Sequence, residues 1–115
     1  ATIGSPHNGT ALAGLGAMLG NEATCPLACR QMAPDSDFLG ALPVAGDASR
    51  WLSVFSSTDD VIRPATSSEL PGATNLEVTA ACGTGPLTHG TLVTAPATAA
   101  LVSSFLATGQ AACSP

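Results

Sequence analysis

The chain contains no lysine, and its only basic side chains are Arg30, Arg50 and Arg63. Eight acidic residues outnumber them and give a formal net charge of −5. Nucleic-acid-binding proteins neutralise phosphates with many Lys and Arg side chains, so we expect no nucleic-acid partner. A cationic helix lying on a membrane surface is excluded for the same reason, because such helices carry a basic polar face.

Long hydrophobic runs are also missing. Every apolar stretch is interrupted by Gly, Pro or a polar residue before the roughly 18 residues that span a bilayer, so we expect no membrane-spanning segment. No basic-then-apolar signal peptide opens the chain, and residues 1–4 are typical of the end of a β-strand already under way. With 45% hydrophobic and only 10% charged residues over 115 positions, the composition predicts one folded domain.

The cysteines predict two disulfides in a secreted protein. The four positions are Cys25, Cys29, Cys82 and Cys113. An even count in a Lys-free, Ser/Thr-rich chain favours disulfides, for which three connectivities exist. Cys25 and Cys29 are four residues apart, and a first helical turn brings their Cα atoms to about 6 Å. We therefore favour Cys25–Cys29 and Cys82–Cys113, the second tying the C-terminal helix to the sheet region.

Metal binding is the weaker interpretation of these residues. A zinc site needs two close Cys/His pairs, whereas His7 and His89 are far from each other and from any second close ligand. We expect neither a metal ion nor a cofactor.

Apolar periodicity and turn residues predict an α/β fold. Thr10, Pro26 and Pro96 are placed to begin helices. The expected elements are a strand end at 1–4, helices at 10–19, 26–32 and 35–42, strands at 51–56 and 75–80, a Gly-rich loop at 82–90 and a helix at 96–109. This order predicts about three mostly parallel strands with flanking helices.

Asp59 and His89 are the candidate catalytic residues. Each follows a predicted strand and lies in a loop at its carboxyl end, where open α/β sheets build their sites. A carboxylate there can accept the Nδ1–H of an imidazole and stabilise the imidazolium when the ring takes a proton. The order Asp then His is also the order that follows the nucleophile in α/β-hydrolases.

Five stretches of the chain resemble secreted bacterial lipases of the α/β-hydrolase superfamily (lipase class 2-like). They are Ile3-Gly4-Ser5-Pro6-His7-Asn8-Gly9-Thr10, Ser56-Ser57-Thr58-Asp59-Asp60-Val61-Ile62, Leu70-Pro71-Gly72-Ala73-Thr74-Asn75-Leu76-Glu77-Val78, Thr88-His89-Gly90-Thr91-Leu92, and the helix 96–106. They resemble the strand and loop after the nucleophile, the acid-bearing loop, the last strand with its turn, the histidine loop and the closing helix. The resemblance implies Asp59 as triad acid and His89 as general base, with Asp60 as the second choice of acid.

The sequence departs from this family at the nucleophile. No G-x-S-x-G occurs, and Ser5, Ser36 and Ser57 each have a local explanation as a loop, cap or turn residue. We therefore expect residues 1–115 to be the C-terminal part of an α/β-hydrolase whose nucleophile-bearing N-terminal half is absent. That half is an expected partner, along with the substrate.

The function predicted on this basis is hydrolysis of carboxylic esters, above all lipids, by a secreted Ser-His-Asp hydrolase. A polyester or polysaccharide-ester hydrolase of the same fold is a further option. The alternative from another class is a non-catalytic, disulfide-stapled secreted domain that binds a partner through its apolar residues 11–42. We expect the helices of 11–42 to pack onto the sheet, with a lid over an acyl pocket as the alternative. His7 is interpreted as a loop histidine bonded to nearby backbone, and Glu77 as a solvated charge.

Overall fold

A three-stranded parallel sheet forms the centre of the computed structural model, which describes residues 1–43 and 50–114. The strands are β1 (Thr2–Ile3), β2 (Leu52–Phe55) and β3 (Thr74–Glu77), in the spatial order β1-β2-β3. Val54 lies in register with Ile3 on one side and Leu76 on the other. The predicted α/β class and parallel sheet are thus confirmed, and the carboxyl ends of the strands share one edge.

The core lies between β2 and the last helix, α6 (Pro96–Thr108). Leu52 and Val54 are fully buried and belong to one apolar cluster with Leu101 and Phe105 of this helix. Alternate residues of a strand point to opposite faces, so β2 turns Ser53 to the other side. There the Ser53 hydroxyl donates to the carbonyl of Ser68, at a short 3-10 turn, with a separation of 2.6 Å.

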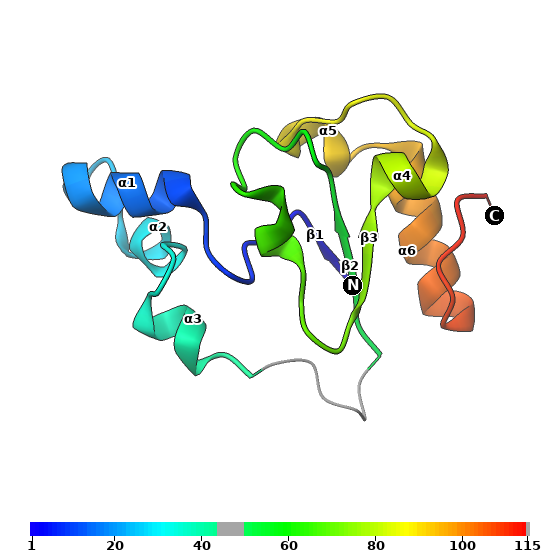
Figure 1. Cartoon of the computed structure of the whole chain (residues 1–115), viewed down its shortest axis with the longest axis horizontal. Coiled ribbons are helices and arrows are strands. Elements are labelled where there is room, and N and C mark those ends of the chain that lie inside the picture. Colours follow the sequence, from blue (N-terminus) through cyan, green and yellow to red (C-terminus); the bar gives the residue numbers. More distant parts are fainter. Residues whose placement is uncertain (44–49, 115) are drawn as a thin grey trace.

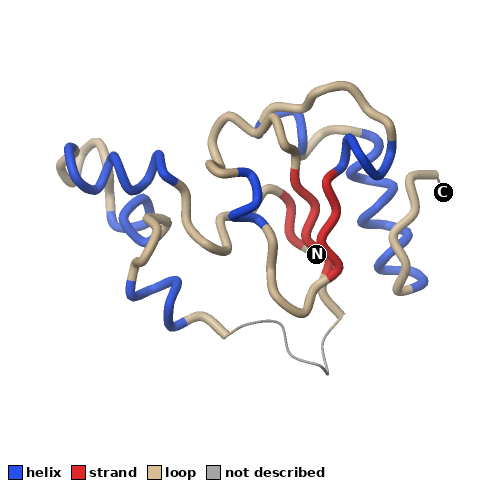
Figure 2. Tube along the Cα trace, viewed as in Figure 1, coloured by secondary structure: helices blue, strands red, loops and turns tan. Residues whose placement is uncertain are grey.

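The helices of the region 11–42 lie beside the sheet instead of covering it (Figures 1 and 2). They are α1 (Ala11–Leu19), α2 (Leu27–Gln31) and α3 (Asp37–Ala41), and they pack mainly on one another. Ala13 is the only buried residue described within the three helices. The expectation that they pack onto the sheet is therefore wrong. The predicted Cys25–Cys29 disulfide is present and joins the residue before the N-cap of α2 to the first turn of this helix.

Thr10 attaches this helical unit to the rest of the molecule. It occupies the N-cap position of α1, but its hydroxyl makes no capping bond. Instead the hydroxyl donates to the carbonyl of Val61 at 2.6 Å and accepts the backbone N–H of Arg63 at 3.0 Å. The backbone N–H of Ala11 also donates to the Arg63 carbonyl. The base of the unit is thus joined to the segment that directly follows Asp59.

The expected strand 75–80 is wrong in its last three residues. β3 ends at Glu77, and the short helix α4 (Val78–Cys82) begins immediately afterwards. The Glu77 side chain starts this helix by accepting the N–H of Ala80 at 2.7 Å, so it is a cap and not a solvated charge. The helix ends at Gly83, whose φ of 66° suits a glycine C-cap. The predicted Cys82–Cys113 disulfide is present and ties α4 to the chain beyond α6.

His89 lies in a helix and not in the expected loop. It is the first residue of α5 (His89–Leu92), which a capping box begins. The Thr88 hydroxyl accepts the Thr91 backbone N–H, and the Thr91 hydroxyl accepts the Thr88 backbone N–H. Figure 1 shows α5 at the end of the sheet toward which β2 and β3 run. The described helices include none that is both long and apolar enough to cross a membrane.

Candidate functional site

The structure brings Asp59 and His89 together at the carboxyl edge of the sheet. Asp59 lies in the turn after β2, and its Oδ2 is 2.8 Å from Nδ1 of His89. With Nδ1–H donating to the carboxylate, Nε2 is the ring nitrogen left to accept a proton. The His89 side chain is 35% exposed, so the ring is accessible to a reacting group.

The backbone holds the Asp59 carboxylate in place. Its Oδ1 accepts the N–H groups of Val61 and Ile62, each at 2.8 Å, in a turn closed by the aspartate itself. Asp59 is only 2% exposed. One oxygen is thus committed to the backbone, which leaves Oδ2 aimed at the ring. A buried carboxylate in this arrangement can orient an imidazole and stabilise its protonated form.

Asp60 contacts the same histidine at a different atom. Its Oδ1 accepts the backbone N–H of His89 at 3.0 Å. This hydrogen bond is the main cause that holds the pKa of Asp60 below its usual range, with smaller contributions from the charges of His89 and Arg63. Of the two candidate acids named from the sequence, Asp59 is therefore the one bonded to the imidazole ring.

Two hydroxyl groups that sequence reasoning missed fix the segment just before His89. The Ser56 and Thr58 hydroxyls donate to the carbonyl of Leu87 at 2.7 and 2.9 Å. The Leu87 N–H in turn donates to the Thr58 hydroxyl at 3.0 Å. The residue types of Ser56-Ser57-Thr58 indicate only a turn, and nothing in the sequence marks Leu87 as its partner.

Gly4, immediately after β1, lies against the pair. A Cβ at this position would be 3.3 Å from both Oδ2 of Asp59 and Cε1 of His89, and 3.2 Å from the Leu92 side chain. Its φ of 53° is also a conformation that glycine adopts without strain. The backbone immediately after the first strand therefore forms one wall of the site.

No nucleophile is hydrogen-bonded to the His89 ring among residues 1–43 and 50–114. The four cysteines are all in disulfides. Ser36 caps α3 by accepting the Leu39 N–H, as expected for a cap residue. The Ser57 backbone N–H donates to Glu77, in keeping with a turn residue. The site as described therefore consists of a carboxylate hydrogen-bonded to an imidazole.

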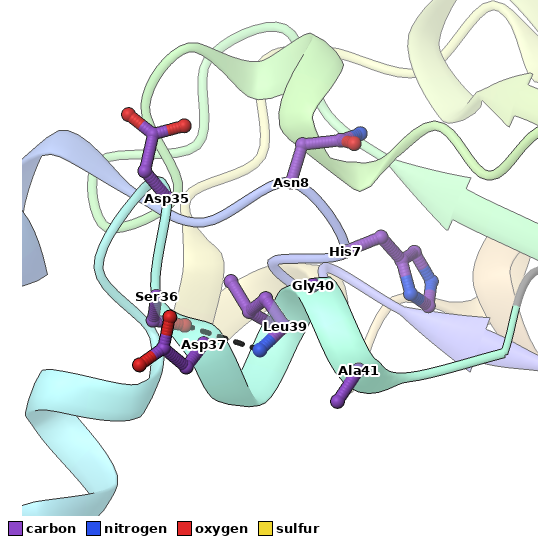
Figure 3. Close-up of a pocket in the computed structure, with 8 residues that line it drawn as sticks. All are labelled: His7, Asn8, Asp35, Ser36, Asp37, Leu39, Gly40 and Ala41. Carbon is purple, nitrogen blue, oxygen red and sulfur yellow. Dashed lines mark hydrogen bonds between the residues drawn. The ribbon is translucent and has the colours of Figure 1, made fainter.

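A separate cavity of about 720 Å³ lies between the loop after β1 and α3 (Figure 3). Its lining comprises His7, Asn8, Asp35, Ser36, Asp37, Leu39, Gly40 and Ala41. Neither Asp59 nor His89 contributes to it, so we place the candidate site at the hydrogen-bonded pair and not at this volume. His7 bonds the Thr2 hydroxyl through Nε2 at 3.0 Å, instead of the backbone as expected. Burial lowers the pKa of His7.

In the part of the chain that the structure describes, no group of three or more His, Cys, Asp or Glu side chains is placed to hold a metal ion. The cysteine sulfurs cannot act as thiolate ligands while they are in disulfides. No family model matches the chain, and no curated protein matches it in sequence. A function must therefore be argued from the geometry of the site itself.

Proposed function

We propose that this chain supplies the acid and the general base of a secreted Ser-His-Asp hydrolase that cleaves carboxylic esters. One observation carries the proposal: the buried Asp59 carboxylate, fixed by two backbone N–H groups, hydrogen-bonds Nδ1 of a partly exposed His89 at the carboxyl edge of a parallel sheet. This arrangement is what acyl transfer requires of its acid and base.

In the proposed reaction, Nε2 of His89 takes the proton of a serine hydroxyl as the serine oxygen attacks the ester carbonyl carbon. Asp59 stabilises the imidazolium through Nδ1. The bond between carbonyl carbon and alkoxy oxygen then breaks, and the alcohol leaves with the proton from His89. Water then gives a proton to the same nitrogen and attacks the carbonyl carbon of the acyl-enzyme. The bond between this carbon and the serine oxygen breaks, His89 returns the proton to the serine oxygen, and the carboxylic acid leaves.

The serine and its oxyanion donors are proposed to come from a segment outside these 115 residues. In the described sheet, β1 pairs with β2 on one side and has no strand on the other. A further parallel strand added there would end at the same edge as the Asp59–His89 pair. That geometry supports a nucleophile-bearing strand next to β1, in a neighbouring part of the protein.

Lipids are the proposed substrate class, because five stretches of the sequence resemble lipases, and polyesters or polysaccharide esters are the second choice. The two disulfides are compatible with secretion, since such bonds persist in oxidising compartments.

A second candidate function is a non-catalytic binding domain that uses residues 11–42. Its support is a set of exposed large apolar side chains on, between or directly after α1, α2 and α3: Leu12, Leu15, Met18, Leu19, Leu27, Met32, Phe38 and Leu42. Met18 is 82% exposed and Leu19 is 77% exposed. A group of large apolar side chains exposed to this extent is typical of a surface that binds a partner. A folded protein without any esterase activity would favour this function over the first.

Labelling with a fluorophosphonate probe tests where the nucleophile lies. We expect the isolated 115-residue chain to remain unlabelled, because its described residues hold no serine bonded to His89. The complete gene product should be labelled, and His89→Ala should abolish that labelling. Strong labelling of the isolated chain that Ser5→Ala removes would instead place the nucleophile in the loop after β1 and contradict an external serine.

A further inference from the structure

We propose that Asp60 is a positioning residue that holds the main chain of His89 so that its ring stays aligned with Asp59. The two consecutive aspartates would then act on one residue from two sides, Asp59 on the imidazole and Asp60 on the backbone. The catalytic importance of this role rests on the proposed function, but the role itself concerns only the placement of His89.

The geometry assigns the two aspartates to different atoms of His89. Asp59 reaches Nδ1 of the ring at 2.8 Å, and Asp60 reaches the backbone nitrogen at 3.0 Å. No hydrogen bond joins Asp60 to the ring among the described contacts. Asp60 is therefore placed to fix the Cα of His89, while Asp59 fixes the rotation of the side chain.

His89 needs such an anchor because of its place in α5. As the first residue of a four-residue helix, it has a backbone N–H with no acceptor inside the helix. The neighbouring anchors act on other residues: Ser56 and Thr58 hold Leu87, and the capping box holds Thr88. The Asp60 carboxylate satisfies the remaining donor directly at the candidate base.

A shift of the His89 backbone would weaken the hydrogen bond between its ring and Asp59. The imidazole has one described hydrogen bond, to Asp59, and a hydrogen bond weakens steeply when its distance and angle depart from the optimum. The ring is also 35% exposed, so water can replace the carboxylate if the two separate. Loss of the Asp60 bond should therefore loosen the ring without unfolding the domain.

Nuclear magnetic resonance of the 115-residue chain measures this role without any substrate. In Asp60→Ala, the backbone N–H of His89 loses its charged acceptor, so the ring can move away from Asp59 more often. We therefore expect exchange of the His89 Nδ1 proton with water to accelerate about tenfold. Asp60→Asn keeps a side-chain oxygen that can accept the N–H and should restore most of the protection. Asp37→Asn removes a similar charge from the first turn of α3, far from the ring, and should leave exchange unchanged.

The same spectra give a second measurement on the unmodified protein. The amide proton of His89 should shift as Asp60 takes up a proton, with a midpoint below the ordinary Asp value of about 3.9, and Asp60→Asn should abolish the shift. The titratable and charged side chains that act on Asp60 are those of His89 and Arg63, and Asp59 is its neighbour in the sequence. An amide that does not titrate, or Nδ1 exchange that is unchanged in Asp60→Ala, would overturn the proposal. Equal acceleration in Asp37→Asn would do the same, and neither result depends on whether the protein is a hydrolase.

Discussion

Gly4 controls how closely β1 approaches the candidate acid and base. The residue lies directly after the strand, and its backbone N–H donates to the carbonyl of Val54 at 2.8 Å. With φ at 53°, a side chain here would combine backbone strain with contacts of 3.3 Å to Oδ2 of Asp59 and Cε1 of His89. Neither neighbour can yield without disturbing the hydrogen bond between them, because Asp59 is also held by two backbone N–H groups.

We therefore expect Gly4→Ala to destabilise the domain by about 1–3 kcal/mol in urea unfolding and to weaken protection of the Nδ1 proton of His89. Gly90→Ala is the matched control, because a Cβ at Gly90 would meet nothing within 4 Å and its φ is not positive. That variant should be neutral or slightly stabilising, since alanine favours a helix over glycine. Equal stability of the two variants would show that Gly4 does not set the approach of β1.

Asp59 and His89 could be selected from the sequence because a carboxylate and an imidazole can act together in proton transfer. Each also follows a predicted strand, where open α/β sheets build their sites. Their contact partners could not, since they depend on three-dimensional proximity. Asp60 and Asp59 are the same residue type side by side, and only the fold decides which one faces the ring. Gly4 carries no side chain, so nothing in the sequence shows what lies next to it.

At the scale of elements, Glu77 joins the end of β3 to the start of α4. Its carboxylate accepts the backbone N–H groups of Ala80, at 2.7 Å, and of Ser57, at 2.9 Å. Burial raises the pKa of Glu77, but the backbone donors of Ser57, Ala80 and Thr79 outweigh this effect, so the pKa lies below its usual range. The ionised form is therefore the one that the folded state prefers.

We expect Glu77→Gln to lower the free energy of unfolding at pH 7 by about 0.5–1 kcal/mol, because solvent screens the charge of this partly exposed cap residue. The native pKa is depressed, so the charge contributes fully above the unfolded value of about 4.3. Its contribution disappears as the pH falls through the lower native value. The difference between the two proteins in urea titrations should therefore shrink at acidic pH.

Glu69→Gln provides the control for this experiment, because Glu69 is exposed and its side chain has no described hydrogen bond. It should leave stability nearly unchanged across the same pH range. A constant difference between Glu77→Gln and the unmodified protein at every pH would contradict the capping role of the charge.

Periodicity predicts the type of most elements, whereas it misplaces some boundaries. The strand expected at 75–80 is too long because Leu76 and Val78 alternate as in a strand, and Val78 is buried in the helix as well. The change from strand to helix at Glu77 depends on side-chain hydrogen bonds to Ala80 and Ser57, and alternation of apolar residues does not report these. In α5, the Thr88 and Thr91 pair is the missed signal for a helix start.

At the scale of the whole molecule, the sheet region and the helical region 11–42 are stabilised differently. The sheet and α6 share an apolar cluster that includes Leu52, Val54 and Leu101. The region 11–42 has few buried side chains, carries its own disulfide and connects to the sheet region through Thr10 and the segment 61–63. The sequence left open whether its apolar residues pack on the sheet or face outward, because helical periodicity shows which residues share a face but not whether that face is covered.

The most direct test of the central claim is ester hydrolysis by the complete gene product that contains these residues, produced with its disulfides and assayed on p-nitrophenyl butyrate. We expect Asp59→Asn and His89→Ala each to lower kcat/KM by about a thousandfold or more, since in the proposed reaction Asp59 orients the general base and His89 is that base. Asp37→Asn should retain activity within about twofold, as surface substitutions away from a site do. Undiminished hydrolysis in His89→Ala, or no hydrolysis by the folded unmodified protein, would contradict the claim.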